Sequence, residues 1–129
     1  MPQRETLSPA PVATARLRHL RMGPRKMRMV ADLVRGRRVG EAIVLLTHTP
    51  RAASTPLRKL LQSARDNAAD LARRDSLQAQ AIGDPEELLI SHVSVDGGPI
   101  LWRWQPRAYG RAGRIRKRTC HVRVELSAR

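Results

Sequence analysis

The sequence has few aromatic residues and almost no cysteine. Phenylalanine is absent, and the only aromatic side chains are those of Trp102, Trp104 and Tyr109. Cys120 is the only cysteine, so no disulfide can form within the sequence, which is typical of a reducing compartment. The hydrophobic core must therefore be built from aliphatic side chains, without help from a covalent crosslink.

Long apolar runs are also missing. No stretch approaches the roughly 20 apolar residues that a membrane-spanning helix needs. The first residues, MPQRETLSPAPVATAR, lack the apolar segment of a secretory signal. We therefore expect a soluble intracellular protein with no membrane partner. Residues 1–13 hold three prolines among small polar residues and are predicted to form a flexible tail, followed by a single domain at 14–129.

Acidic residues are far outnumbered by basic ones. The chain has 25 Lys and Arg residues against 11 Asp and Glu, which leaves a formal net charge of +14. Such an excess repels itself in a free monomer, and a polyanion such as nucleic acid is the usual partner that relieves it. Lys26, Lys59 and Lys117 are the only lysines. Arginine predominates, and its guanidinium fork fits two phosphate oxygens at once.

No pattern in the sequence supports catalysis, a metal site or a cofactor. None of the four histidines is spaced as a metal ligand relative to another histidine or to the cysteine. Glu86 and Glu87 are adjacent on a predicted loop, where solvated surface charge is a better interpretation than an acid/base pair. No glycine-rich phosphate loop lies between a strand and a helix. We expect a protein that is not an enzyme and that takes no cofactor, metal or small-molecule substrate.

The spacing of apolar residues predicts an α+β fold. Three helices are expected to pack on a small three-stranded antiparallel sheet, from which a long β-hairpin protrudes. The expected elements are a strand at 14–22, helices from Pro24 to about Gly36, at 39–47 and from after Pro50 to about Arg74, a loop at 75–88, and strands at 88–96 and 119–126.

The protruding hairpin is predicted at about residues 96–118. At ~3.3 Å per residue its first arm reaches on the order of 40 Å, which is more than a domain of this size is wide. The stretch RWQPRAYGRAGRIRKRT (103–119), which includes its tip and return strand, contains no carboxylate. Trp102 and Trp104 fall on one face, where they can stiffen the ribbon by cross-strand packing or stack on unpaired bases; the sequence leaves both uses open.

A second basic patch is predicted around the first helix. Its members are Arg16, Arg18, Arg21, Arg25, Lys26, Arg28 and Arg35. The alternative is an ordinary solvated helix face, which Asp32 would neutralise only in part.

Three collinear motifs resemble a known family. GPRKMRMVADLVRG (23–36), VDGGP (95–99) and PRAYGRAGRIRKRTCH (106–121) are similar to the universal large-subunit ribosomal proteins numbered twenty-two in the bacterial naming, and the resemblance covers about residues 15–126. It implies a body on the outer surface of the large subunit near the exit of the peptide tunnel. It also implies a hairpin that runs inward through ribosomal RNA, whose tip helps to form the narrow part of the tunnel wall.

The resemblance and the charge pattern together predict the functional residues. Those expected to bind ribosomal RNA are Arg16, Arg18, Arg21, Arg25, Lys26, Arg28, Arg35, Arg103, Arg107, Arg111, Arg114, Arg116, Lys117, Arg118 and His121. Those expected to line the tunnel at the hairpin tip are Arg103, Pro106, Arg107, Ala108, Tyr109, Gly110 and Arg111. The implied partners are large-subunit ribosomal RNA, neighbouring ribosomal proteins and the nascent polypeptide. The implied location is a cytoplasmic or organellar ribosome, where the protein would also support assembly.

The chain departs from the family pattern at several positions. Gly23 and Cys120 stand where serine is usual, and Gly97 stands where glutamate is usual. Trp102 and Trp104 replace positions that are typically basic and aliphatic, and the segment at about 70–87 is longer than the resemblance leads us to expect. The resemblance also implies that changes at the hairpin tip affect macrolide antibiotics, and because of these departures that role does not transfer directly to this chain.

Two other functions fit part of the pattern. An architectural DNA-binding protein could insert a basic β-arm with a proline near its tip into the minor groove, although the sequence shows no obvious dimer seam. A peptide acting on membrane surfaces would need an amphipathic cationic helix. Pro106, Gly110 and Gly113 disfavour that helix.

Overall fold

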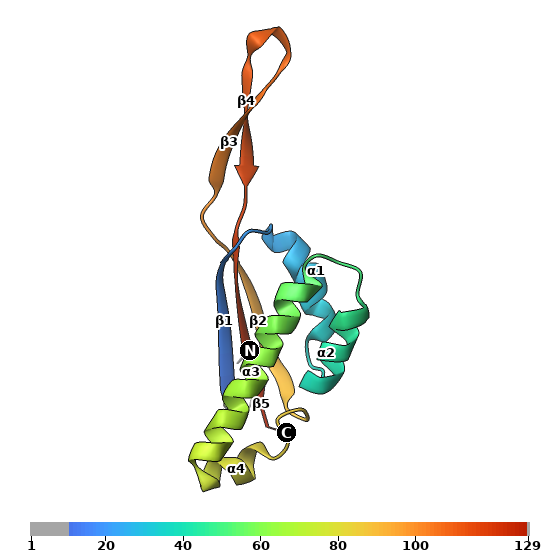
Figure 1. Cartoon of the computed structure of the whole chain (residues 1–129), viewed down its shortest axis with the longest axis vertical. Coiled ribbons are helices and arrows are strands. Elements are labelled where there is room, and N and C mark those ends of the chain that lie inside the picture. The colour runs from blue at the N-terminus through green and yellow to red at the C-terminus, as the bar shows by residue number, and fades with distance from the viewer. Residues whose placement is uncertain (1–10, 129) are drawn as a thin grey trace, which may run out of the picture.

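The computed structural model describes residues 11–128 and shows helices lying against a sheet from which a thin hairpin extends (Figure 1). The elements in chain order are β1 (Ala13–Leu20), α1 (Pro24–Val34), α2 (Val39–His48), α3 (Ser54–Arg74), α4 (Ser76–Ile82), β2 (Leu89–Gly97), β3 (Leu101–Pro106), the 3-10 turn η1 (Ala108–Gly110), β4 (Ala112–Lys117) and β5 (Cys120–Ser127). The α+β class is confirmed.

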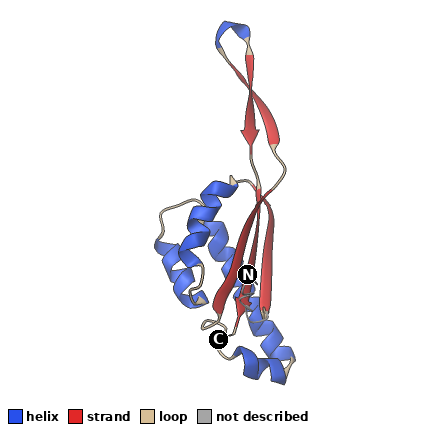
Figure 2. Ribbon diagram, turned by 180° about the vertical axis from the view of Figure 1, so that it is seen from behind, coloured by secondary structure: helices blue, strands red, loops and turns tan. Residues whose placement is uncertain are grey.

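The body is built on a three-stranded antiparallel sheet with the order β1-β5-β2. The last strand of the chain lies in the centre, so its backbone is hydrogen-bonded on both sides, and Val124 pairs with Ala15 of β1 and with Val93 of β2. Alternate side chains of β5 are buried, as its period of two predicts. The view from behind shows the three strands running side by side toward the base of the hairpin (Figure 2).

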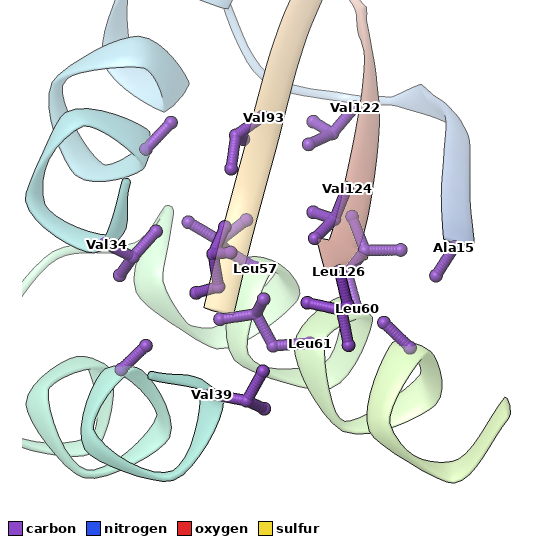
Figure 3. Close-up of a cluster of buried hydrophobic side chains, with 14 of the residues drawn as sticks. Ala15, Val34, Val39, Leu57, Leu60, Leu61, Val93, Val122, Val124 and Leu126 are labelled. Carbon is purple, nitrogen blue, oxygen red and sulfur yellow. The ribbon is translucent and has the colours of Figure 1, made fainter. Parts of the chain in front are cut away.

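The core is aliphatic, as the composition requires. The apolar residues at helical spacing are buried in α1 (Met27, Val30, Ala31 and Val34) and in α3 (Leu57, Leu60, Leu61, Ala64 and Ala68). Leu71, the last apolar residue of the predicted α3 stripe, is only partly buried. They meet the buried face of the sheet in one cluster, which includes Val93, Val122 and Leu126 (Figure 3). Each Val, Leu or Met side chain of this cluster contributes about 1.5–3 kcal/mol when it is fully removed from water.

The prediction of a loop over 75–88 is wrong in part, because α4 occupies Ser76–Ile82. Residues 11–128 therefore form four α-helices rather than three. The Asp75 side chain caps α4 by accepting a 3.0 Å hydrogen bond from the backbone N–H of Leu77. Only Ile82 of this short helix is buried, whereas Leu77 is exposed. One buried position gives no apolar period, and for that reason the pattern did not indicate a helix.

The predicted hairpin forms a second, two-stranded sheet in addition to the three-stranded sheet of the body. Strands β3 and β4 pair from Leu101 opposite Lys117 to Pro106 opposite Ala112, apart from the sheet of the body. Figure 1 shows this ladder projecting beyond the body, as the segment length predicts. The strand expected at 14–22 is β1, which begins at Ala13, inside the segment predicted to be a tail. The tail prediction also fails at Val12, whose backbone N–H donates a 2.7 Å hydrogen bond to the carbonyl of Leu126, and residues 1–10 lie outside the described residues.

Candidate nucleic-acid interface

A groove of about 580 Å³ lies where the hairpin leaves the body. We call it the basic groove. It is lined by Arg21, Met22, Gly23, Lys26, Ala52, Arg103, Arg116, Lys117, Arg118 and Thr119. These residues come from the start of α1 and the segment before it, the connection between α2 and α3, both strands of the hairpin, and the link between β4 and β5. None of these lining residues is acidic. Two patches far apart in the sequence therefore form one positive surface.

The direction of the hairpin is set at its base by Thr119. Its buried hydroxyl donates a 2.7 Å hydrogen bond to the carbonyl of Pro99, and its own carbonyl accepts from the N–H of Gly98 at 2.9 Å. A Cβ added to Gly98 would lie 2.4 Å from the hydroxyl oxygen of Thr119. Only glycine lets the two arms approach this closely, so the junction holds the hairpin cations beside α1.

His121, predicted to contact RNA, uses one of its two ring nitrogens in a hydrogen bond within the body. Its Nδ1 accepts a 3.0 Å hydrogen bond from the backbone N–H of His19, and the two rings meet edge to face at 4.7 Å. His19 has a φ of 55° and lies where the β1–β5 register shifts. Since Nδ1 accepts, the neutral ring carries its proton on Nε2, which is the atom that remains for an outside acceptor.

Arg28 and Arg35, also predicted to bind RNA, are directed toward the free edge of β2. The Arg28 Nε and Nη2 atoms donate to the carbonyl of Val95 at 3.2 and 3.0 Å. Arg35 donates to the carbonyl of Val93 at 3.1 Å and forms an exposed ion pair with Asp32 at 3.4 Å. These contacts cover an edge that would otherwise present unpaired carbonyl groups. The patch predicted around the first helix therefore has two parts. Arg28 and Arg35 cover the edge of β2, whereas Arg21 and Lys26 line the basic groove.

The remaining predicted cations of the body lie elsewhere. Arg16 and Arg18 line a shallow depression on β1 and β5 together with His121 and Arg123, and Arg25 is exposed on α1. Asp96 also lines that depression, so it is less uniformly positive than the basic groove.

The hairpin tip is a tight turn with two successive residues of positive φ. Tyr109 has φ 58° and ψ 37°, and Gly110 has φ 65°, which is the requirement of a type I′ hairpin turn. The Tyr109 side chain is 99% exposed, and the backbone N–H of Arg107 donates to Arg111 at 2.7 Å. Arg103 was predicted to be a tip residue, but it lies near the start of β3, opposite Ile115, and lines the basic groove.

The two tryptophans share one face of the hairpin with two arginines. The register places Trp102 opposite Arg116 and Trp104 opposite Arg114. The Arg114 guanidinium carbon lies 4.4 Å from the centre of the Trp102 ring and 5.5 Å from that of Trp104, and Arg116 lies 5.9 Å from Trp102. We call these four residues the Trp–Arg face. The sequence placed the two rings together, but only the register shows which cations lie over them.

The Cys120 thiol is buried at the start of β5. Burial raises the pKa of this thiol above its ordinary value, and the positive charge of Arg28 opposes that shift in part. The group is therefore held as an unreactive thiol. Within residues 11–128 no three His, Cys, Asp or Glu side chains are grouped to hold a metal ion. Over the same residues, no helix has the length and apolar character needed to cross a membrane.

Comparison with known proteins gives concordant matches. The family model described as ribosomal protein L22p/L17e matches residues 15–127. Proteins named large ribosomal subunit protein uL22 from Anaeromyxobacter sp. strain K and from Anaeromyxobacter dehalogenans strains 2CP-1 and 2CP-C are each 45% identical to the chain over 119 residues. Each alignment covers 92% of this chain and 76% of the relative.

Proposed function

The chain belongs to the ribosomal protein L22p/L17e family, whose members are structural proteins and not enzymes, and we propose that it is a constituent of the large ribosomal subunit that binds ribosomal RNA and supports assembly. Its partners are then large-subunit RNA and neighbouring ribosomal proteins, and its location is the ribosome. The bacterial relatives favour a cytoplasmic bacterial ribosome over an organellar one.

The observation that carries this proposal is the basic groove. Arg21 and Lys26 from the body face Arg103, Lys117 and Arg118 from the hairpin around one concave surface. Cations gathered without carboxylates repel one another, and phosphate groups in the groove would remove that repulsion. Contacts of this kind position a protein on RNA through the backbone, so recognition comes from the shape of the RNA more than from its base sequence.

The hairpin extends the same chemistry away from the body. Residues 97–124 contain no Asp or Glu, and the β3–β4 ladder is exposed on both strands. A ribbon two strands wide with cations along its length can pass between RNA segments whose phosphates would repel any acidic surface.

The tip is proposed to line the nascent-peptide tunnel. Pro106, Arg107, Ala108, Tyr109, Gly110 and Arg111 form its exposed end. The support for this role is the family membership together with the place of the turn, which lies at the far end of the molecule from α4 (Figure 1).

Binding to a large-subunit RNA fragment, measured over a range of salt concentrations, tests the proposal. Each phosphate neutralised contributes about −0.7 to −0.9 to the log-log slope of affinity against salt. Replacing Lys117 and Arg118 with glutamine removes two cations of the groove and should make the slope shallower by about 1.4 to 1.8.

A matched control removes two cations at the other end of the body. Arg73 and Arg74 are exposed at the end of α3, and their replacement with glutamine changes the net charge by the same amount. The control should leave the slope nearly unchanged. Equal effects of the two pairs, an affinity independent of salt, or absence of the protein from large subunits in sedimented cell extract would reject the proposal.

A further inference from the structure

The Trp–Arg face contains the only tryptophans of the chain, and neither belongs to the core. Trp102 is 43% exposed and lies beneath two guanidinium groups, those of Arg114 and Arg116. Trp104 is 65% exposed and lies near one, that of Arg114, at the longer distance of 5.5 Å. A cation over each ring is enough to stiffen the ribbon, but it leaves most of the Trp104 surface in water.

We infer that Trp104 is a stacking site for an unpaired nucleobase of RNA, with Arg114 holding the phosphate beside that base. The inference rests on the proposed function and adds to it the kind of RNA feature that this face accepts.

The chemistry of the face matches a nucleotide on two counts. An indole ring stacks on any base, because every base presents a π-face. A guanidinium group that lies over a ring still directs its N–H donors outward in its own plane, where they reach phosphate oxygens. A carboxylate ligand would pair with Arg114 but would not stack on the Trp104 ring. A base without a phosphate would stack on the ring but would leave Arg114 without an anion. The combination, in a segment without acidic residues, favours an unpaired nucleotide.

The face is also continuous with the basic groove. Arg116 contributes to both, since it lies over Trp102 and lines the groove. An RNA strand whose phosphates occupy the groove can therefore continue along the hairpin and place a base on Trp104. Paired bases cannot do this, because their faces are covered by their neighbours in the helix.

Tryptophan fluorescence of the full chain reads the Trp–Arg face directly, because Trp102 and Trp104 are its only tryptophans. Trp102→Phe leaves Trp104 as the only emitter, and Trp104→Phe leaves Trp102. We expect single-stranded oligouridylate to quench the emission of Trp104 strongly and that of Trp102 less. A duplex RNA of equal length and inorganic polyphosphate, which has charge but no bases, should quench neither strongly. Equal quenching by polyphosphate and by oligouridylate would overturn the inference.

Affinity supplies the second measurement. Trp104→Leu keeps an apolar side chain but removes the flat ring, and it should weaken oligouridylate binding about fivefold or more. Trp104→Phe keeps a flat ring and should retain most of the affinity. Duplex RNA should bind the wild type and both variants equally within about twofold, which shows that the hairpin is still formed. Oligouridylate binding that is unchanged in Trp104→Leu would overturn the inference.

The result is separable from the proposed function. If the variants at Trp104 bind single strands normally while the Lys117 and Arg118 pair still changes the salt slope, only the stacking site is wrong. If replacing Lys117 and Arg118 leaves the salt slope of RNA binding unchanged, the proposed RNA surface is wrong, whatever the tryptophan fluorescence shows.

Discussion

The hydroxyl of Thr119 donates a 2.7 Å hydrogen bond to the carbonyl of Pro99, across the two arms of the hairpin where they leave the body. The same hydroxyl oxygen occupies the space that a side chain at Gly98 would need. One threonine thus joins the arms and excludes any residue but glycine from the facing position. The direction of the hairpin, and with it the shape of the basic groove, depends on this contact.

Substitution at the hairpin base should show strong coupling between the two positions. Gly98→Ala forces a Cβ into the hydroxyl of Thr119 and should lower the free energy of unfolding by about 1–3 kcal/mol. Thr119→Ala removes one hydrogen bond, at a cost of about 0.5–1.5 kcal/mol. Together they should cost less than the sum, because Thr119→Ala removes the clashing atom. Urea unfolding measures the four proteins of this cycle.

A neighbouring glycine provides the control for that cycle. A Cβ at Gly97 would meet no atom within 4 Å, so Gly97→Ala should change stability by less than about 0.5 kcal/mol. Additive costs in the Gly98 and Thr119 cycle would show that the contact does not define the junction.

Covering of the β2 edge should make Arg28 a stabilising residue. Arg28→Met keeps an unbranched apolar side chain but leaves the carbonyl of Val95 without its charged donor, at an expected cost of about 1.5–3 kcal/mol. Arg25→Met, on the exposed side of the same helix, is the control and should cost under about 0.5 kcal/mol. Thermal or urea unfolding distinguishes them. Equal stabilities would mean that Arg28 is available for RNA alone.

The turn at the tip should depend on the glycine at position 110. Gly110→Val places a β-branched residue at a φ of 65°, which costs about 1–2 kcal/mol. Amide hydrogen exchange in β3 and β4 should then be about 5- to 30-fold faster, because the ladder opens locally. Ala112→Val, in the strand beside the turn, should not accelerate exchange. Unchanged protection in Gly110→Val would show that the turn geometry is not required.

The raised pKa of Cys120 makes a prediction about stability at alkaline pH. A thiol that holds its proton more tightly in the folded state contributes stability that is fully present below its unfolded pKa of about 8.5 and is lost as pH rises through the higher folded value. The urea midpoint of the wild type relative to Cys120→Ala should therefore fall between pH 7 and pH 10. Taking the difference between the two proteins cancels the titration of all other groups. A difference in urea midpoint that stays constant from pH 7 to pH 10 would contradict the raised pKa of Cys120.

Much of the fold is predictable from local pattern. Apolar spacing identified α1 and α3, and alternation identified β5, because each of these elements buries one regular face. The helix α4 escaped the same reasoning, since it buries only Ile82 and is held by its caps. Periodicity detects an element through the face it buries, so it fails for an element that buries almost nothing.

The candidate site was predictable in composition but not in arrangement. Arg28 and Lys26 are both basic residues on α1, yet Arg28 donates to β2 and Lys26 lines the groove. Nothing local in the sequence separates them, because the difference depends on which strand lies beside each side chain. The cations over Trp102 likewise follow from the β3–β4 register.

The sequence by itself determined the net charge, the aliphatic core and a hairpin without carboxylates. These properties follow from composition and from the spacing of residues that are close together in the sequence. Tertiary structure decided which cations share a surface. It brings Arg21 and Lys117 to the same groove, whereas Arg35 donates a hydrogen bond to β2. The physical reason is that the positions of these cations relative to one another depend on the close approach of the chain at Gly98 and on the β3–β4 register. Both are interactions between residues that are far apart in the sequence.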